Sequence, residues 1–326
     1  MAIAITRTLA ACALLSALPA AAQQPAETAY PERPVRVVVP VAPGGSTDLV
    51  ARIMSGKLGD ALGKTFVVDN RAGAGALIGT DVVAKAAPDG YTLLFAYAAH
   101  TIAPFIFSRV PYDVFNDFTP ITLVASQPLL LTINPSIGTS SVKELIALAK
   151  AKPGQLNVGL ATPSSSGALI AEWFKVVTHT NITSVPFKGG ALAMTALLQG
   201  EIQFMFATAP AAMPHLKSGK ARVIATSGDH RLSYLPEVPT LDEVGLKGFE
   251  AEPWGGFLGP ARLPRAIVDR IYQASTESLK QADTRERLAA SGNVPVGSSP
   301  EKFAQRLARE LRQNAELIKR VGMKAD

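Results

Sequence analysis

The stretch "PVAPGGSTDLVAR" (residues 40–52) directly follows the apolar run "VRVVV" (35–39). The run is typical of a strand, and the residues after Ser46 have the apolar spacing of a helix. A helix that begins at Ser46 or Thr47 leaves up to four backbone N–H groups without an intrahelical partner. Glycine lets an anionic oxygen approach such a backbone closely. The turn therefore indicates either a helix cap or an anion-binding site, and on its own it leaves both interpretations open.

Strands and helices alternate along the rest of the chain. Apolar runs such as "TFVVDN" (65–70) and "YTLLFAY" (91–97) are typical of strands, and helix-like stretches separate them. Helices of this length between strands imply parallel sheets with right-handed crossovers. Two strand-like runs, 118–126 and 128–135, have no helix between them. We therefore expect the chain to change sheet or domain at that point.

A chain of 326 residues is long enough for two domains, each with its own hydrophobic core. We expect a first α/β domain made of residues 31–127 and 250–326, and a second made of residues 128–249. The chain would cross between these domains twice and leave a cleft at the crossing. Open α/β sheets bind ligands in such a place, outside the carboxyl ends of the strands.

The first 22 residues have the layout of a cleaved secretory signal. Arg7 precedes an apolar stretch from Leu9 to Leu18, and small residues follow up to Ala22. The stretch is too short to span a membrane. We therefore expect export of the chain, with cleavage near Ala22. A lipoprotein signal at Cys12 is less favoured, because Cys12 lies before most of the apolar stretch.

The composition argues against several classes of function. The net charge is +6 without a run of five or six basic residues, so no nucleic-acid partner is expected. Cys12 is the only cysteine and would leave with the signal, which excludes disulfides and Cys-bound metals in the mature chain. The four histidines lack metal-binding spacing. Ser140–Lys143 matches S-x-x-K, but its companion motifs are missing. We expect no catalytic residue, metal or cofactor.

Three further glycine-rich or hydroxyl-rich turns connect a strand to a helix. "NRAGAGALIGT" (70–80) approaches a dinucleotide-binding fingerprint, but Ile78 stands where the third glycine is required. "TPSSSGAL" (162–169) and "PFKGGAL" (186–192) repeat the chemistry of the first turn. If both domains aim such turns at one cleft, N–H and hydroxyl groups would hold an anion from two sides. Otherwise each is an ordinary turn.

Taken together, the chain resembles the periplasmic substrate-binding proteins of tripartite tricarboxylate transporters, the Bug proteins. The resemblance extends over the mature chain and rests on the order and spacing of "PVAPGGSTDLVAR", "VVDNRAGAGALIGT", "APDGYTLL", "VPFKGGALAMTALLQGEI", "HLKSGKARVIATSGDHR", "LPEVPTLDEVGLKGFE" and "WGGFLGP". It implies a two-lobed, type II-like Venus-flytrap fold with a ligand cleft between two α/β lobes. It also implies a periplasmic location, membrane permease subunits as partners and no enzymatic activity. The expected ligand is a small carboxylate, a di- or tricarboxylate that can be aromatic. We expect a monomer.

The resemblance also implies which residues contact the ligand. First-lobe contacts would lie in two stretches, Pro43–Asp48 and Tyr97–His100, and second-lobe contacts in three turns. The expected ligand-binding residues are Pro43, Gly44, Gly45, Ser46, Thr47, Asp48, Tyr97, Ala98, His100, Thr162, Ser164, Ser165, Ser166, Lys188, Gly189, Gly190, Ala207 and Thr208.

Two departures from the family pattern bear on the ligand. Ala168 stands near the place of a family histidine, and Ala207 stands where an acidic residue is common. Fewer polar side chains are therefore expected in the cleft. Four aromatic residues lie in or beside its motifs, namely Tyr97, Phe187, Phe206 and Trp254. This favours a more apolar, even aromatic, carboxylate over citrate, unless these aromatic side chains belong to the core.

Two other functions stay open at this stage. A binding protein of the same fold can serve a two-component sensor instead of a transporter, and neighbouring permease genes would distinguish the two roles. A secreted hydrolase is the alternative from another class, although the sequence offers no nucleophile–base pair for it.

Overall fold

The computed structural model describes residues 30–161, 165–187, 189–228, 230–247 and 252–322. A compact unit runs from Pro31 to Asp326 and carries the fold. The predicted signal at residues 1–22 lies outside the described residues. Within the described ranges, no helix combines the length and apolar character that a membrane span requires.

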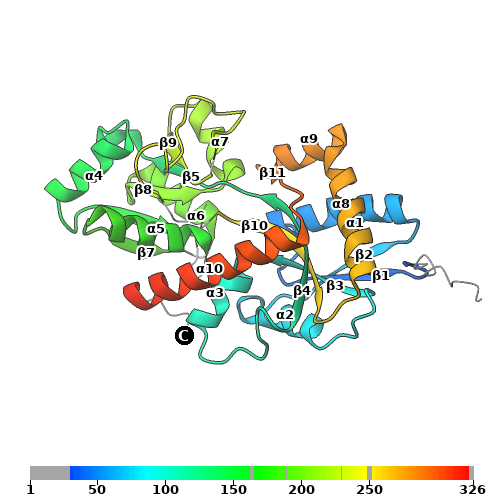
Figure 1. The fold of residues 1–326 in the computed structure, drawn as a ribbon. Coiled ribbons are helices and arrows are strands. Elements are labelled where there is room, and N and C mark those ends of the chain that lie inside the picture. Colours follow the sequence, from blue (N-terminus) through cyan, green and yellow to red (C-terminus); the bar gives the residue numbers. More distant parts are fainter. Residues whose placement is uncertain (1–29, 162–164, 188, 229, 248–251, 323–326) are drawn as a thin grey trace, which may run out of the picture. The chain divides into compact units, whose positions relative to one another are not determined.

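The described residues form two mixed sheets (Figure 1). The first has the strand order β11-β4-β10-β3-β1-β2, in which β1, β2 and β3 are parallel and β10 runs antiparallel to both of its neighbours. Its strands are β1 (Val35–Val39), β2 (Phe66–Asn70), β3 (Thr92–Tyr97), β4 (Phe118–Ser126), β10 (Trp254–Pro260) and β11 (Val294–Pro295).

The second sheet has the order β7-β6-β8-β5-β9. Strand β6 is parallel to β7 and β8, whereas β5 is antiparallel to β8 and β9. Its strands are β5 (Leu130–Ile133), β6 (Asn157–Leu160), β7 (Thr183–Pro186), β8 (Phe204–Ala207) and β9 (Arg222–Thr226). The chain passes between the sheets twice, from β4 to β5 and from β9 to β10. The domain boundaries drawn from the sequence stay a prediction.

Helices flank both sheets (Figure 1). Those that follow strands of the first sheet are α1 (Ser46–Leu62), α2 (Leu77–Ala84), α3 (Ala99–Ile106), α8 (Arg265–Lys280), α9 (Ala282–Ala290) and α10 (Pro300–Val321). Those of the second are α4 (Val142–Ala151), α5 (Ser166–Thr178), α6 (Gly190–Gln199) and α7 (Ala209–Lys217). Two short 3-10 turns, η1 (Ala74–Ala76) and η2 (Pro135–Ile137), complete the elements.

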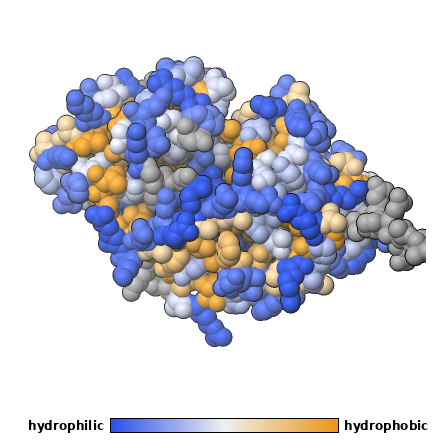
Figure 2. Space-filling model, in the orientation of Figure 1, coloured by the Kyte–Doolittle hydropathy of each residue, from blue (hydrophilic) through white to orange (hydrophobic). Residues whose placement is uncertain are grey.

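The long helix α10 shows how the helices cover the sheets. Its buried positions include Phe303, Leu307, Leu317 and Ile318, which recur at helical spacing. Figure 2 shows hydrophilic residues along its outward side. The buried side packs against α3 and β4, so the C-terminal helix supports the first sheet.

Strand β10 is entirely buried although three of its seven residues are glycine. The sequence analysis expects only an extended or loop segment here, because glycine weakens strands. A Cβ atom on Gly255 would lie 2.7 Å from the Phe95 ring. A Cβ atom on Gly256 would lie 2.8 Å from both the Phe303 ring and the Thr122 carbonyl oxygen. Aromatic rings from other elements therefore fill the space that side chains of β10 would occupy.

We expect Gly256→Ala to lower the free energy of unfolding by about 1–3 kcal/mol, because its methyl group meets a backbone oxygen in a packed sheet. Gly56→Ala is the matched control. Gly56 lies inside α1, and nothing stands within 4 Å of its Cβ position. This control should be neutral or stabilising by up to ~1 kcal/mol. Urea unfolding measures both variants, and equal effects would contradict the packing described for β10.

Candidate functional site

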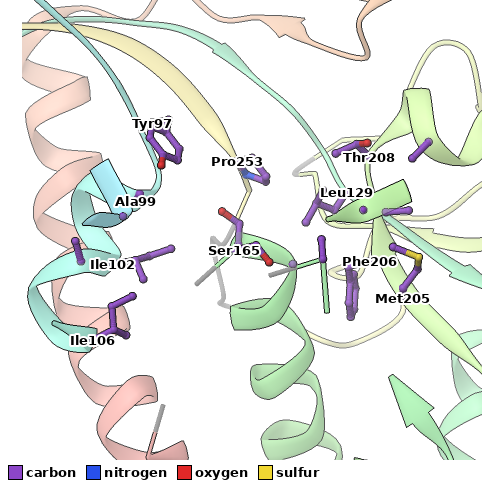
Figure 3. Close-up of a pocket in the computed structure, with 18 of the residues that line it drawn as sticks. Tyr97, Ala99, Ile102, Ile106, Leu129, Ser165, Met205, Phe206, Thr208 and Pro253 are labelled. Atoms are coloured by element: carbon purple, nitrogen blue, oxygen red, sulfur yellow. The ribbon is translucent and has the colours of Figure 1, made fainter. Parts of the chain in front are cut away.

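A cavity of about 260 Å³ lies between elements of the two sheets (Figure 3). Tyr97 and residues of α3 line it on the side of the first sheet. The ends of β6 and β8, together with the first residues of α5 and α6, line it on the side of the second. Leu129 and Pro253 lie at the two passages of the chain between the sheets and also line the cavity. The cavity is thus built where the sequence analysis expects a cleft.

Helix N-termini supply most of the polar groups of the cavity. Ser166 and Gly167 begin α5, Gly190 begins α6, and Thr208 is the N-cap residue of α7. On the opposite side, Ala99 is the first residue of α3. Each helix N-terminus leaves N–H groups without intrahelical acceptors and carries a partial positive charge. The cavity is therefore suited to an anion even though its described lining contains no charged side chain.

Two hydroxyl groups at these helix ends have different structural roles. The Ser165 hydroxyl accepts a hydrogen bond from the Ala168 N–H at 3.2 Å and so caps α5. Thr208 makes no such side-chain capping bond at α7. The Thr208 hydroxyl is therefore not committed to holding the start of its helix.

One face of α3 forms the apolar wall of the cavity. Ala99, Ile102, Ala103 and Ile106 line it at the i, i+3, i+4, i+7 spacing of a single helix face. Phe107, the residue after the helix, continues this wall. Figure 3 shows Ile102 and Ile106 facing the side of the cavity that carries Phe206 and Met205. The sequence analysis missed this wall, because an apolar helix face that lines a cavity has the same pattern as one that packs in a core.

The opposite face of α3 is held by a buried carboxylate. Glu310 accepts hydrogen bonds from the Thr101 hydroxyl at 2.9 Å, from Trp254 Nε1 at 2.9 Å and from Arg306 Nε at 2.8 Å. Trp254 is only 3% exposed, so this side chain belongs to the core rather than to the ligand site. Its neighbour Pro253 lines the cavity. Glu310 thus ties α10 both to α3 and to the start of β10.

His100 points away from the cavity. The side chain is 3% exposed, its Nε2 lies 3.0 Å from the Val114 carbonyl oxygen, and the Phe118 ring meets it edge-on at 4.9 Å. Burial lowers the pKa of His100 to about 4, and the hydrogen bond with Val114 only partly opposes this. The imidazole is therefore neutral at physiological pH and packs in the core behind α3. The structure does not bring this predicted site residue into the cavity.

The turn before α1 already holds an anion of the chain itself. The carboxylate of Asp48 accepts hydrogen bonds from the Gly44 N–H, Arg52 Nε and Asn70 Nδ2, each at 2.9 Å. Burial alone would raise the pKa of Asp48, but these hydrogen bonds outweigh it and hold the pKa below its usual value. The Gly44 N–H is therefore engaged by an internal carboxylate.

Ser46 in the same turn is also held by neighbours from elsewhere in the first sheet. Its hydroxyl oxygen accepts hydrogen bonds from Gln127 Nε2 at 2.9 Å and from Asn293 Nδ2 at 3.1 Å. Within the described residues, the N–H groups of Gly45, Ser46 and Thr47 donate no hydrogen bond. In the turn before α1, the Gly44 N–H and the Ser46 hydroxyl are thus hydrogen-bonded within the protein. The three N–H groups at the start of the helix are not.

The structure brings together only part of the predicted site. The predicted residues that line the cavity are Tyr97, Ser165, Ser166, Gly190, Ala207 and Thr208. The predicted residues outside its lining are Pro43, Gly44, Gly45, Ser46, Thr47, Asp48, Ala98, His100 and Gly189. Thr162, Ser164 and Lys188 lie outside the described residues. Across the part of the chain that is described, no group of three or more His, Cys, Asp or Glu side chains is arranged to hold a metal.

The two sheets, the two passages between them and the cavity lined from both sides match the two-lobed fold of periplasmic binding proteins. This confirms the predicted α/β fold class. Residues 50–323 match the tripartite tricarboxylate transporter family receptor, and the chain belongs to this family. The resemblance seen in the sequence is thereby confirmed.

Three relatives illustrate the similarity. BugT of Bordetella pertussis is 35% identical over 322 residues, which cover 98% of this chain and 99% of BugT. A Rhodopseudomonas palustris protein solved with adipate is 31% identical, with a TM-score of 0.76, and the match covers 90% of this chain and 99% of that one. MatC from the same organism, solved with bound malate, is 31% identical with a TM-score of 0.72, covering 89% and 100% of the two chains.

The neutral state of His100 leads to a prediction about pH. Its folded pKa of about 4 lies below the ordinary value of 6.5, so the unfolded chain binds the proton first. The stability gained from the neutral ring is complete above pH 6.5 and is lost as the pH falls toward 4. His100→Gln keeps a donor for Val114 but does not titrate. We expect the native chain to lose about 2–3 kcal/mol more than this variant between pH 7 and 4.

Urea unfolding at a series of pH values measures this difference. His215→Gln on α7 is the control for the loss of an imidazole that is partly exposed and outside this core. Parallel pH curves for the native chain and His100→Gln would contradict the burial of a neutral His100.

Proposed function

We propose that this chain is a periplasmic receptor that binds a small carboxylate in the cavity and presents it to the membrane permease subunits of a tripartite transporter, without turnover. Membership of the receptor family supports the transport role. The adipate and malate in two solved relatives support a carboxylate ligand. The signal pattern that ends at Ala22 supports export, and we expect the mature receptor to be monomeric.

The observation that carries this proposal is the meeting of several helix N-termini at one cavity with an uncharged described lining. A hydrogen bond to a charged group is worth ~1.5–3 kcal/mol. Three or four such bonds, less the cost of ordering both partners, approach the ~8.2 kcal/mol of a micromolar complex. Backbone N–H groups and hydroxyls can thus bind a carboxylate without a basic side chain.

Binding in this cavity is coupled to movement of the lobes. The apolar wall of α3 belongs to one lobe and the N-termini of α5, α6 and α7 to the other, so a ligand contacts both. Leu129 and Pro253 lie at the passages and also line the cavity. A rotation of the lobes about these passages therefore changes the width of the cavity. Closure is also the step that brings the turn at Pro43–Asp48 toward the ligand, and its three N–H groups at Gly45–Thr47 then complete the first-lobe contacts.

The first prediction from this proposal concerns charge and compaction. A thermal-shift panel of hexanoate, adipate, malate, citrate and benzoate selects a ligand for calorimetry and small-angle X-ray scattering. We expect the carboxylate to bind and to reduce the radius of gyration, while its amide analogue binds at least about tenfold more weakly because it lacks the charge. A chelator should change nothing. Equal affinity for the amide, or tight binding without compaction, would contradict the proposal.

The second prediction isolates one hydroxyl of the cavity. Thr208→Val keeps the side-chain shape and removes a hydroxyl that does not cap α7. We expect the affinity for the selected carboxylate to fall about tenfold and the free energy of unfolding to change by less than ~0.5 kcal/mol. Thr195→Val is the control, because the exposed Thr195 hydroxyl bonds to the Ala191 carbonyl oxygen within α6. An unchanged affinity in Thr208→Val would remove Thr208 from the site.

A further inference from the structure

We propose that the ligand carries a single carboxylate on an apolar body, and that the receptor selects against a second carboxylate. This inference rests on the proposed function and specifies its substrate class. It follows from how polar and apolar groups are distributed along the cavity.

The hydroxyl-bearing side chains labelled in Figure 3 lie away from Ile106. Figure 3 shows Tyr97 and Thr208 on either side of the cavity at one end, with Pro253 and Leu129 near them, Ser165 further in, and Ile106 at the other end. Ala99, at the start of α3, lies on the polar side, so the N-terminus of this helix points the same way. One carboxylate placed here meets donors from both lobes.

Among the described residues, the other end offers no side chain that pairs with a charge. Ile102 and Ile106 from the first lobe face Phe206 and Met205 from the second there, and Phe107, which also lines the cavity, directly follows Ile106. The polar residues of α3 are engaged elsewhere, since Thr101 bonds to Glu310 and His100 to Val114. A second carboxylate at this end would lose its hydration without gaining a partner, which is strongly unfavourable. The apolar end encloses an alkyl chain or an aromatic ring, which gains affinity by leaving water.

Matched acid pairs test the inference by titration calorimetry on the mature chain. Hexanoate is compared with adipate, and benzoate with terephthalate, so that each pair differs only by the second carboxylate. We expect at least one monocarboxylate to bind about tenfold or more tightly than its diacid. If neither monocarboxylate binds more tightly than its diacid, the inference is wrong while the proposed function stands. If none of these acids binds, nor malate or citrate, both fail.

A charge placed at the apolar end gives a second test. Phe107 is partly exposed, so Phe107→Arg adds a guanidinium there while leaving it access to water. We expect the preference for hexanoate over adipate to shrink about tenfold, because the second carboxylate now has a partner. Phe115→Arg is the control: Phe115 is 46% exposed and outside the cavity lining, and the preference should not change. An unchanged preference in a folded Phe107→Arg would overturn the inference, and the acid pairs decide it if that variant does not fold.

Discussion

Strand β10 returns the chain to the first sheet between β3 and β4, and its glycines are what let it lie there. Without side chains at Gly255 and Gly256, the rings of Phe95 and Phe303 pack directly over the strand. The second passage between the lobes therefore ends at a fixed point, because Trp254 begins the strand directly after Pro253. Pro253 lines the cavity, so the packing that closes the first sheet also sets one edge of the binding site.

The carboxylate of Glu310 extends this constraint to the cavity wall. It is buried and receives three donors, from α3, α10 and β10. Removing one partner from such a group leaves a buried charge incompletely paired, which is costly. The bond from Thr101 therefore fixes the rotation of α3 about its own axis, and the face with Ile102 and Ile106 is turned to the cavity as a result. The apolar character of the wall thus depends on a polar network behind it.

Much of the fold was predictable from the sequence, because the strand-to-helix alternation is a local pattern. Strands β1 to β3 pair in parallel as expected, and the adjacent runs at 118–126 and 128–135 do belong to different sheets. Strand β10 was not predictable, since its stability depends on rings distant in the sequence, such as Phe303. The hydroxyl-rich and glycine-rich turns of the site can be recognised from short stretches of sequence. The orientation of α3 cannot, because it depends on Glu310, which is distant from α3 in the sequence. The engagement of Gly44 by Asp48 likewise depends on side-chain geometry that the sequence does not specify.

The uncharged character of the described lining has a consequence for how a receptor of this kind holds and releases a ligand. Hydrogen bonds from N–H groups are weak while water competes for them, and they strengthen when a cavity closes and its effective dielectric constant falls. Donors of this type therefore bind strongly only in the closed state. An ion pair with an arginine would persist more strongly in the open state and slow release. The donors around this cavity come from helix ends on both lobes. Under the proposed function, opening of the lobes would separate these donors and weaken the whole set at once, so release would need only the separation of the lobes at the passages beside Leu129 and Pro253.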